Sequence, residues 1–111
     1  MATQNEKTAR FRALHERPGV FVMPNPWDVG SARLLASLGF EALATTSAGF
    51  AWTLGKPDGG VTREEALAHC RAICAAVDVP VTAALGTPIV VTIAGAALVL
   101  FRAHHVPVAS V

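Results

Sequence analysis

Residues 20–39, VFVMPNPWDVGSARLLASLG, contain the signals for a strand, a turn and a helix in immediate succession. The first four residues, Val20–Met23, are a short run of β-forming apolar residues between Gly19 and Pro24, which predicts a buried strand. Asn25 and Pro26 then supply a capping side chain followed by proline at the first helical position. The next apolar residues recur at helical spacing until Gly39 and predict a helix: Val29, Ala32, Leu34, Leu35 and Leu38.

The same order of signals recurs along the chain. Phe40–Thr45 (FEALAT) predicts a second strand, and the capping box TREE at residues 62–65 opens a helix that reaches about Val77. Val79–Thr82 predicts a third strand, and a short amphipathic helix over Lys7–His15 precedes all of these elements. Strands that alternate with helices pair in parallel, in a doubly wound sheet or in a (β/α) barrel. We therefore expect an α/β fold with about three βα units over residues 1–83.

Residues 84–111 differ in composition from the preceding part of the chain. Asp78 is the last acidic residue, and beyond it the only full charge is Arg102. The apolar run Pro88–Phe101 follows neither the helical nor the strand period, so we treat residues 84–111 as a divergent apolar tail. Extended back to Leu85, this run approaches the roughly 20 residues of a membrane span. A small membrane-anchored protein is therefore one alternative, although we do not favour it.

Composition and charge narrow the class of protein. With 111 residues and a net charge of +1, the chain predicts at most one globular domain and has no basic stripe for nucleic acid. The polar residues 1–8 lack the apolar segment of a signal peptide, which predicts a cytoplasmic location. Cys70 and Cys74 lie four residues apart in a predicted helix, as two reduced thiols on one face. A metal site built from them with His69 is the less favoured alternative.

Polar residues that follow the predicted strands are the candidate site residues. Asn25 and Asp28 come after the first strand, where (β/α) barrels place active-site loops, although either could simply cap the helix while Trp27 fills the core. The segment Thr45-Thr46-Ser47-Ala48-Gly49 follows the second strand, and its hydroxyl and N–H groups could converge on a carboxylate or phosphate oxygen. Asp58 precedes a glycine, so its ordinary interpretation is a turn former. The loop over residues 46–61 is longer than a usual βα connection, and loops of this length often carry functional residues.

Taken together, these segments resemble a known enzyme family. The block FVMPNPWDVGSARLLASLGFEALATTSAGFAWTLGKPDGGVTREEALAH, followed by a helix and the strand VPVTA, is similar to the isocitrate lyase/phosphoenolpyruvate mutase superfamily. It is most similar to the oxaloacetate decarboxylase-like and carboxyphosphonoenolpyruvate mutase-like branch. The resemblance covers about residues 7–83, the N-terminal part of such an enzyme.

The resemblance implies a fold, a chemistry and a set of site residues. Enzymes of this family are tetrameric eight-stranded (β/α) barrels that cleave or form C–C or P–C bonds of small 2-oxo or related carboxylic acids. Mg²⁺ polarises the oxygens of the acid and stabilises the enolate that develops. By the same resemblance, Thr45, Thr46, Ser47 and Ala48 form the substrate-binding turn, and Asp58 is the catalytic carboxylate that faces the metal through water.

The sequence departs from this family after the third predicted strand. Where family members carry a sequence like Ala-Asp-Leu-Glu-Asn-Gly, with the principal Mg²⁺ ligand, this chain reads Ala83-Ala84-Leu85-Gly86. A complete barrel also takes about 250 residues. We therefore expect that the chain does not itself bind Mg²⁺ and is a truncated, inactive form, its tail the product of a shifted reading frame or a pseudogene. The alternative is a non-catalytic module that associates with a full-length homologue or a second copy.

Overall fold

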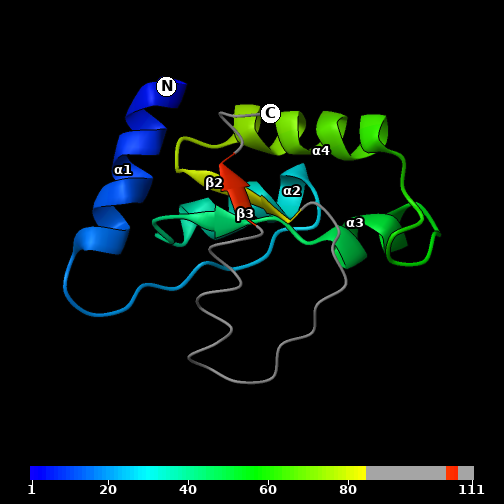
Figure 1. Ribbon diagram of the computed structural model, residues 1–111, viewed down its shortest axis with the longest axis horizontal. Helices are drawn as coiled ribbons and strands as arrows, with labels where there is room; N and C mark the ends of the chain where they lie inside the picture. Colours follow the sequence, from blue (N-terminus) through cyan, green and yellow to red (C-terminus); the bar gives the residue numbers. More distant parts are fainter. Residues whose placement is uncertain (85–104, 108–111) are drawn as a thin grey trace.

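The computed structural model describes residues 1–84 and 105–107 of the chain (Figure 1). The described elements are four helices and three short strands, and the predicted α/β class is confirmed. In chain order they are α1 (Gln4–Glu16), α2 (Val29–Ser37), β1 (Leu43–Ala44), α3 (Ser47–Thr53), α4 (Arg63–Ala76), β2 (Val81–Ala84) and β3 (His105–Pro107).

The described strands form one sheet in the order β1-β2-β3. β1 and β2 are parallel, with Leu43 opposite Val81, as the βα repeat predicts. β2 begins two residues later than expected, after Pro80, which has no N–H group to donate to a ladder. β3 pairs with β2 in the antiparallel sense, so the strand on this side of β2 does not continue the all-parallel order of a barrel (Figure 1).

The strand predicted over Val20–Met23 is wrong. This segment belongs to none of the described strands, and Val20 and Val22 are 95% and 64% exposed. The residue after the segment, Pro24, accepts a backbone hydrogen bond from the N–H of Ala44 at 3.0 Å. An apolar run becomes a buried strand only when a ladder and a covering layer are both present, and the described residues supply neither on its outer side.

Side chains cap the helices, and of the three predicted helices α4 begins where the sequence predicts. The other two starts were predicted wrongly: α1 begins at Gln4, three residues before the predicted Lys7, and α2 begins at Val29 because Asp28, and not Asn25, caps it. Thr3, Asp28 and Thr62 each form a capping box with the residue three positions on, at the starts of α1, α2 and α4. The long loop after β1 was not expected to contain a helix, yet α3 lies within it, capped by Thr46.

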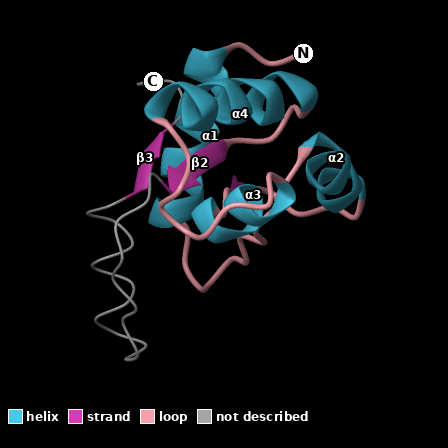
Figure 2. Cartoon of the chain, turned by 90° about the vertical axis from the view of Figure 1, so that its right-hand side faces the viewer, coloured by secondary structure: helices cyan, strands magenta, loops and turns pink. Residues whose placement is uncertain are grey.

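The core lies between the sheet and the helices α2 and α4 (Figure 2). Its central side chains are Leu43 of β1 and Ile73 of α4, both fully buried. Cys70 and Cys74 face this core as free thiols, which confirms their predicted place on one face of a helix.

Helix α1 crosses the carboxyl end of α4 and is held there mainly by polar contacts (Figure 1). The ammonium of Lys7, which is 5% exposed, donates to the carbonyls of Cys74 and Val77 at 3.0 and 2.6 Å. At the other end of the helix, Arg17 forms a bidentate ion pair with Glu41, at 2.8 and 3.0 Å. The partners of Lys7 precede β2 and the partner of Arg17 precedes β1, so α1 covers the end of the sheet at which the strands begin, opposite their carboxyl ends.

Within residues 1–84 and 105–107, none of the helices has the length and apolar character that a membrane crossing requires. The run Leu85–Phe101, which we considered as an anchor, lies outside the described residues.

Candidate active site

The carboxyl ends of the strands are joined by a short series of hydrogen bonds. The N–H of Thr45 donates to the carbonyl of Thr82 at 2.9 Å, where β1 meets β2. On the other side of β1, the side-chain amide of Asn25 donates to the carbonyl of Ala44 at 2.8 Å. The segment after residue 24, the end of β1 and β2 are therefore fixed against one another at this edge of the sheet.

The candidate substrate-binding turn begins where β1 ends and continues into the first turn of α3. Thr46 caps α3 by accepting a hydrogen bond from the N–H of Gly49 at 3.1 Å. Ser47 and Ala48 follow in the first helical turn and are half-buried. N–H groups in the first turn have no acceptor within a helix, which makes those of Ser47 and Ala48 suitable donors for an oxygen anion.

Thr45 differs from its neighbours in the direction of its side chain. It is buried, and its side chain is hydrogen-bonded to the Cys70 thiol of α4. Burial raises the pKa of Cys70, and the bond from Thr45 opposes that change. Thr45 therefore contacts the helical layer with its side chain, and only its backbone belongs to the edge where the turn lies.

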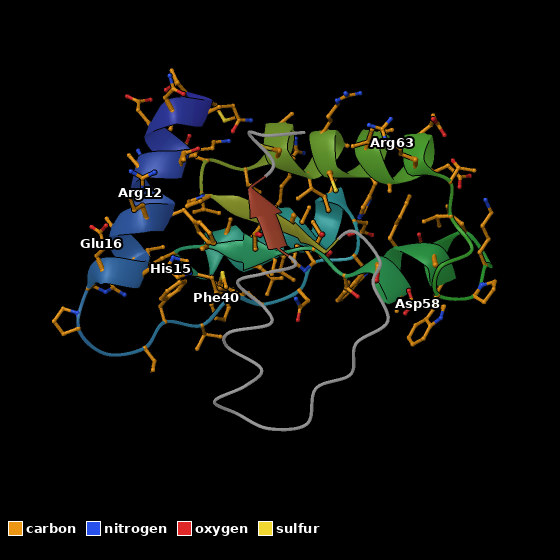
Figure 3. All side chains as sticks on the ribbon, in the orientation of Figure 1. Arg12, His15, Glu16, Phe40, Asp58 and Arg63 are labelled. Carbon is orange, nitrogen blue, oxygen red and sulfur yellow. The ribbon has the colours of Figure 1, made fainter. Side chains whose placement is uncertain are left out.

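Asp58 lies in the loop between α3 and α4, and it is exposed (Figure 3). The surrounding turn is closed by a hydrogen bond from the N–H of Gly60 to the carbonyl of Pro57, at 2.9 Å. Gly59 has a φ of 82°, which suits the residue after Asp58 to glycine. The loop is fastened to α4 by Lys56, whose ammonium lies 2.8 Å from a carboxylate oxygen of Glu65.

Asp28 caps α2, as the alternative interpretation of this residue predicted. Its carboxylate accepts from the N–H of Ser31 at 2.7 Å, and this bond is the main reason that the pKa of Asp28 lies below its ordinary value. Asn25 does not cap the helix but holds the end of β1. Trp27 was expected to fill the core if these residues were structural, and that expectation is wrong because its surface is 50% exposed.

No sequence pattern predicted the contact between Phe50 of α3 and His69 of α4. Their rings are stacked, with centroids 3.7 Å apart and planes 8° from parallel. The Nε2 atom of His69 is buried and, among the described residues, has no hydrogen-bond partner. Burial lowers the pKa of His69, while the carboxylate of Asp28 partly opposes this. No short-range spacing connects residues 50 and 69, so only the tertiary structure reveals the pair.

Comparison with known proteins identifies the family. The sequence profile of phosphoenolpyruvate phosphomutase matches residues 11–102. The chain belongs to the phosphoenolpyruvate phosphomutase family. This finding confirms the predicted membership of the isocitrate lyase/phosphoenolpyruvate mutase superfamily.

Solved and curated members of the superfamily are similar to parts of this chain. A structure from Burkholderia cenocepacia J2315, provisionally described as a lyase/mutase, is 55% identical, with a TM-score of 0.72 over 74% of this chain and 30% of that one. 2,3-Dimethylmalate lyase is 35% identical, with a TM-score of 0.61 over 75% of this chain and 30% of that one. An uncharacterized protein of Mycobacterium tuberculosis is 47% identical over 49 residues, which are 44% of this chain and 19% of the relative.

The chain therefore spans less than a third of the length of these relatives. The described part of this phosphomutase-family chain corresponds to the N-terminal part of their fold. The number of three βα units stays a prediction, as does the boundary between residues 83 and 84.

The side chains at the strand ends do not suit the divalent cation that the family resemblance implies. Ala83 and Ala84 end β2, and their methyl groups carry no donor atom. Among residues 1–84 and 105–107, no three His, Cys, Asp or Glu side chains gather in a group that could hold a metal ion. His69, Cys70 and Cys74, the less favoured metal site considered above, do not form such a group either. The thiols of Cys70 and Cys74 lie in the core.

Proposed function

We propose that this chain carries the substrate-binding turn of an enzyme that acts on a small 2-oxo or related carboxylic acid. The observation that supports this most directly is the position of Thr46, Ser47 and Ala48 at the carboxyl end of β1, where α/β barrels bind their substrates. A carboxylate there would accept hydrogen bonds from the N–H groups of Ser47 and Ala48 and from the hydroxyl groups of Thr46 and Ser47.

The reaction class follows from the family and its relatives. The family is described as phosphoenolpyruvate phosphomutase, and one similar structure is a 2,3-dimethylmalate lyase, so mutases and lyases both occur among the proteins to which this chain is similar. We assign this chain to the carbon–carbon lyase group as the first choice. Asp58 is the proposed catalytic carboxylate, and its exposed turn leaves it accessible to groups on other segments.

Binding at the turn is tested with oxalate, a small planar dicarboxylate, on the ¹⁵N-labelled chain. The amide signals of Ser47 and Ala48 should shift saturably, and the fluorescence of Trp27 should change in parallel, because its Cβ lies 3.2 Å from where a Cβ on Gly49 would be. Sodium chloride at equal ionic strength is the control. Shifts that are equal with chloride, or that spare these two amides, would exclude the turn as a carboxylate site.

We further propose that the chain alone is catalytically inactive, because β2 ends in Ala83 and Ala84 where a family member has its metal-binding carboxylate. No catalytic step through Mg²⁺ is assigned to these residues. With Mg²⁺ and either oxaloacetate or 2-methylisocitrate, the purified chain should show only the background rate of substrate loss. Turnover that scales with the concentration of the chain would contradict this.

A second candidate function, association with a full-length homologue or a second copy, is favoured by exposed apolar side chains. Val20, Val22, Leu34 and Leu38 are 95%, 64%, 60% and 67% exposed. Side chains of this type are generally covered in a folded assembly when they form one patch. Light scattering after size exclusion should give more than one copy per particle; a monomer that also fails to bind a co-expressed homologue would exclude this function.

A cytoplasmic location likewise stays a prediction, which fractionation of cells would test.

A further inference from the structure

Helix α3, which begins with the proposed substrate-binding turn, has few connections to the rest of the fold. It is seven residues long, with Ala51 as its one fully buried residue. Its start is capped by Thr46, and near its end the N–H of Lys56 donates to the carbonyl of Ala51 at 2.9 Å. Trp52 is 70% exposed and makes no part of the core. The first residue of the turn, Thr45, is anchored by its N–H to Thr82 and by its side chain to Cys70. For the following residues, which belong to α3, the stack of Phe50 on His69 is the ring contact that joins the helix to α4.

The surroundings of His69 do not favour a positive charge on its ring. Residues 47–53 of α3 include no ionisable side chain. On α2, the Asp28 carboxylate is already an acceptor for Ser31, and Arg33 is exposed. On α4 itself, Glu65 lies one turn before His69, and its charge is paired with Lys56.

These groups explain the direction of the pKa. Burial lowers the pKa of His69 from its ordinary value of 6.5, and the smaller opposing effect of the Asp28 charge does not compensate. The neutral ring therefore stacks on Phe50 near pH 7. A proton would bring a charge to a site where Nε2 has no described partner, so the charged ring is stabilised by moving into water.

We propose that His69 is a positioning residue whose neutral ring, stacked on Phe50, holds α3 and the substrate-binding turn in place, and whose protonation releases them. The link to substrate rests on the proposed function of the turn, whereas the link between His69 and α3 does not. An aromatic pair of this kind contributes about 0.5–1.5 kcal/mol, so release should weaken binding of a small carboxylate about 2- to 10-fold.

The coupling is tested first without any ligand, by nuclear magnetic resonance between pH 7.5 and 5. The ring signals of His69 should titrate below pH 6.5, and the amide signals of Thr46, Ser47 and Ala48 should shift with the same midpoint. A His15→Phe variant is the control, because the ring of His15 on α1 packs between Phe11 and Phe21, and the turn amides should still follow His69 in that variant. Turn amides that do not follow His69 would overturn the proposal.

Two substitutions of the same residue separate stacking from charge. His69→Phe keeps an aromatic ring against Phe50 but cannot be protonated, so the turn amides should stay at their neutral-pH positions throughout. His69→Ala removes the ring, and the amides should take their acidic positions at every pH. If His69→Ala does not fold, Phe50→Leu serves instead, and it should also raise the pKa of His69 towards its ordinary value. A His69→Phe variant whose turn still responds to pH would contradict the proposal.

A final measurement distinguishes this proposal from the proposed function. Oxalate affinity should fall about 2- to 10-fold on acidification in the parent chain and stay constant in His69→Phe. If oxalate binds at no pH while the amides follow His69, the positioning role stands and the substrate assignment fails. If oxalate binds equally well on both sides of the midpoint, the substrate assignment stands and the positioning role fails.

Discussion

Lys7 is a basic residue whose burial is explained by two carbonyl groups. Its ammonium lies 3.0 Å from the carbonyl of Cys74 and 2.6 Å from that of Val77, at the end of α4 where carbonyls lack helical partners. Replacing Lys7 by Met keeps most of the stem but leaves these acceptors without the charged donor. We expect a loss of about 1–3 kcal/mol in the free energy of unfolding, measured by urea denaturation.

The matched control for Lys7 is Arg12→Met on the same helix. Arg12 is exposed and points away from α4 (Figure 3). Its replacement should change the free energy of unfolding by less than about 0.5 kcal/mol. Equal effects of the two substitutions would mean that the contacts of Lys7 are not specific.

Asp28 allows helix capping to be separated from charge. Asn caps helices about as well as Asp, so Asp28→Asn should retain most of the stability, whereas Asp28→Ala should lose about 0.5–2 kcal/mol. Both substitutions remove the carboxylate that raises the pKa of His69, so both should lower that pKa further. Thermal unfolding measures the change in stability, and the proton resonances of the His69 imidazole measure the change in its pKa. An Ala variant as stable as the parent would show that the cap is unimportant.

At the level of elements, α3 depends on a glycine in its first turn. A Cβ on Gly49 would lie 2.6 Å from Cγ2 of Thr46 and 3.2 Å from Cβ of Trp27, so Thr46 would have to move from its capping position. We expect Gly49→Ala to destabilise the fold by about 0.5–2 kcal/mol and to weaken oxalate binding. Urea denaturation and the oxalate titration measure these effects.

Gly30 of α2 provides the comparison for Gly49. A Cβ there would meet only Oδ1 of Asp28, at an ordinary contact distance of 3.5 Å. Because alanine is the better helix former, Gly30→Ala should stabilise the protein by up to about 1 kcal/mol. The two Gly→Ala changes should therefore have opposite signs, and a shared sign would mean that helix propensity alone controls both positions.

For the whole molecule, stability should fall in two stages as the pH is lowered. The pKa of His69 is lowered by folding, so the unfolded chain takes up a proton first and stability declines below about pH 6.5. The pKa values of Glu6, Asp28 and Glu65 are lowered by hydrogen bonds with Thr3, Ser31 and Lys56, so their contribution is lost below their ordinary values of 3.8–4.5. Melting temperatures from pH 7.5 to 3 measure both stages. His69→Phe should remove the first stage only.

The sequence predicted the elements whose signals are local. The capping box at Thr62 predicted the start of α4, and the helical spacing up to Gly39 predicted that α2 exists, although its start was placed at Pro26 and not at Val29. The β1-β2 pair was expected from the alternation of strands and helices. The family was recognisable from residues 21–69, and the candidate turn, Thr45 to Ala48, was identified with it.

Features that depend on distant partners could not be predicted in this way. Val20–Met23 has the composition of a buried strand, but burial requires a covering layer, which its own residues do not encode. α3 was not expected because seven residues rich in small side chains have little intrinsic helical preference, and its position depends on Thr46 and on the ring of His69.

The sequence by itself determined the α/β class, the family, the existence of α1, α2 and α4, and the start of α4, because caps, periodicity and a motif block act over a few residues. Only the tertiary structure decided that Thr45 turns its side chain towards Cys70, that Lys7 closes the end of α4, and that Phe50 meets His69. Each of these contacts joins residues at least 19 positions apart, and their energies depend on burial and geometry that exist only after the chain has folded.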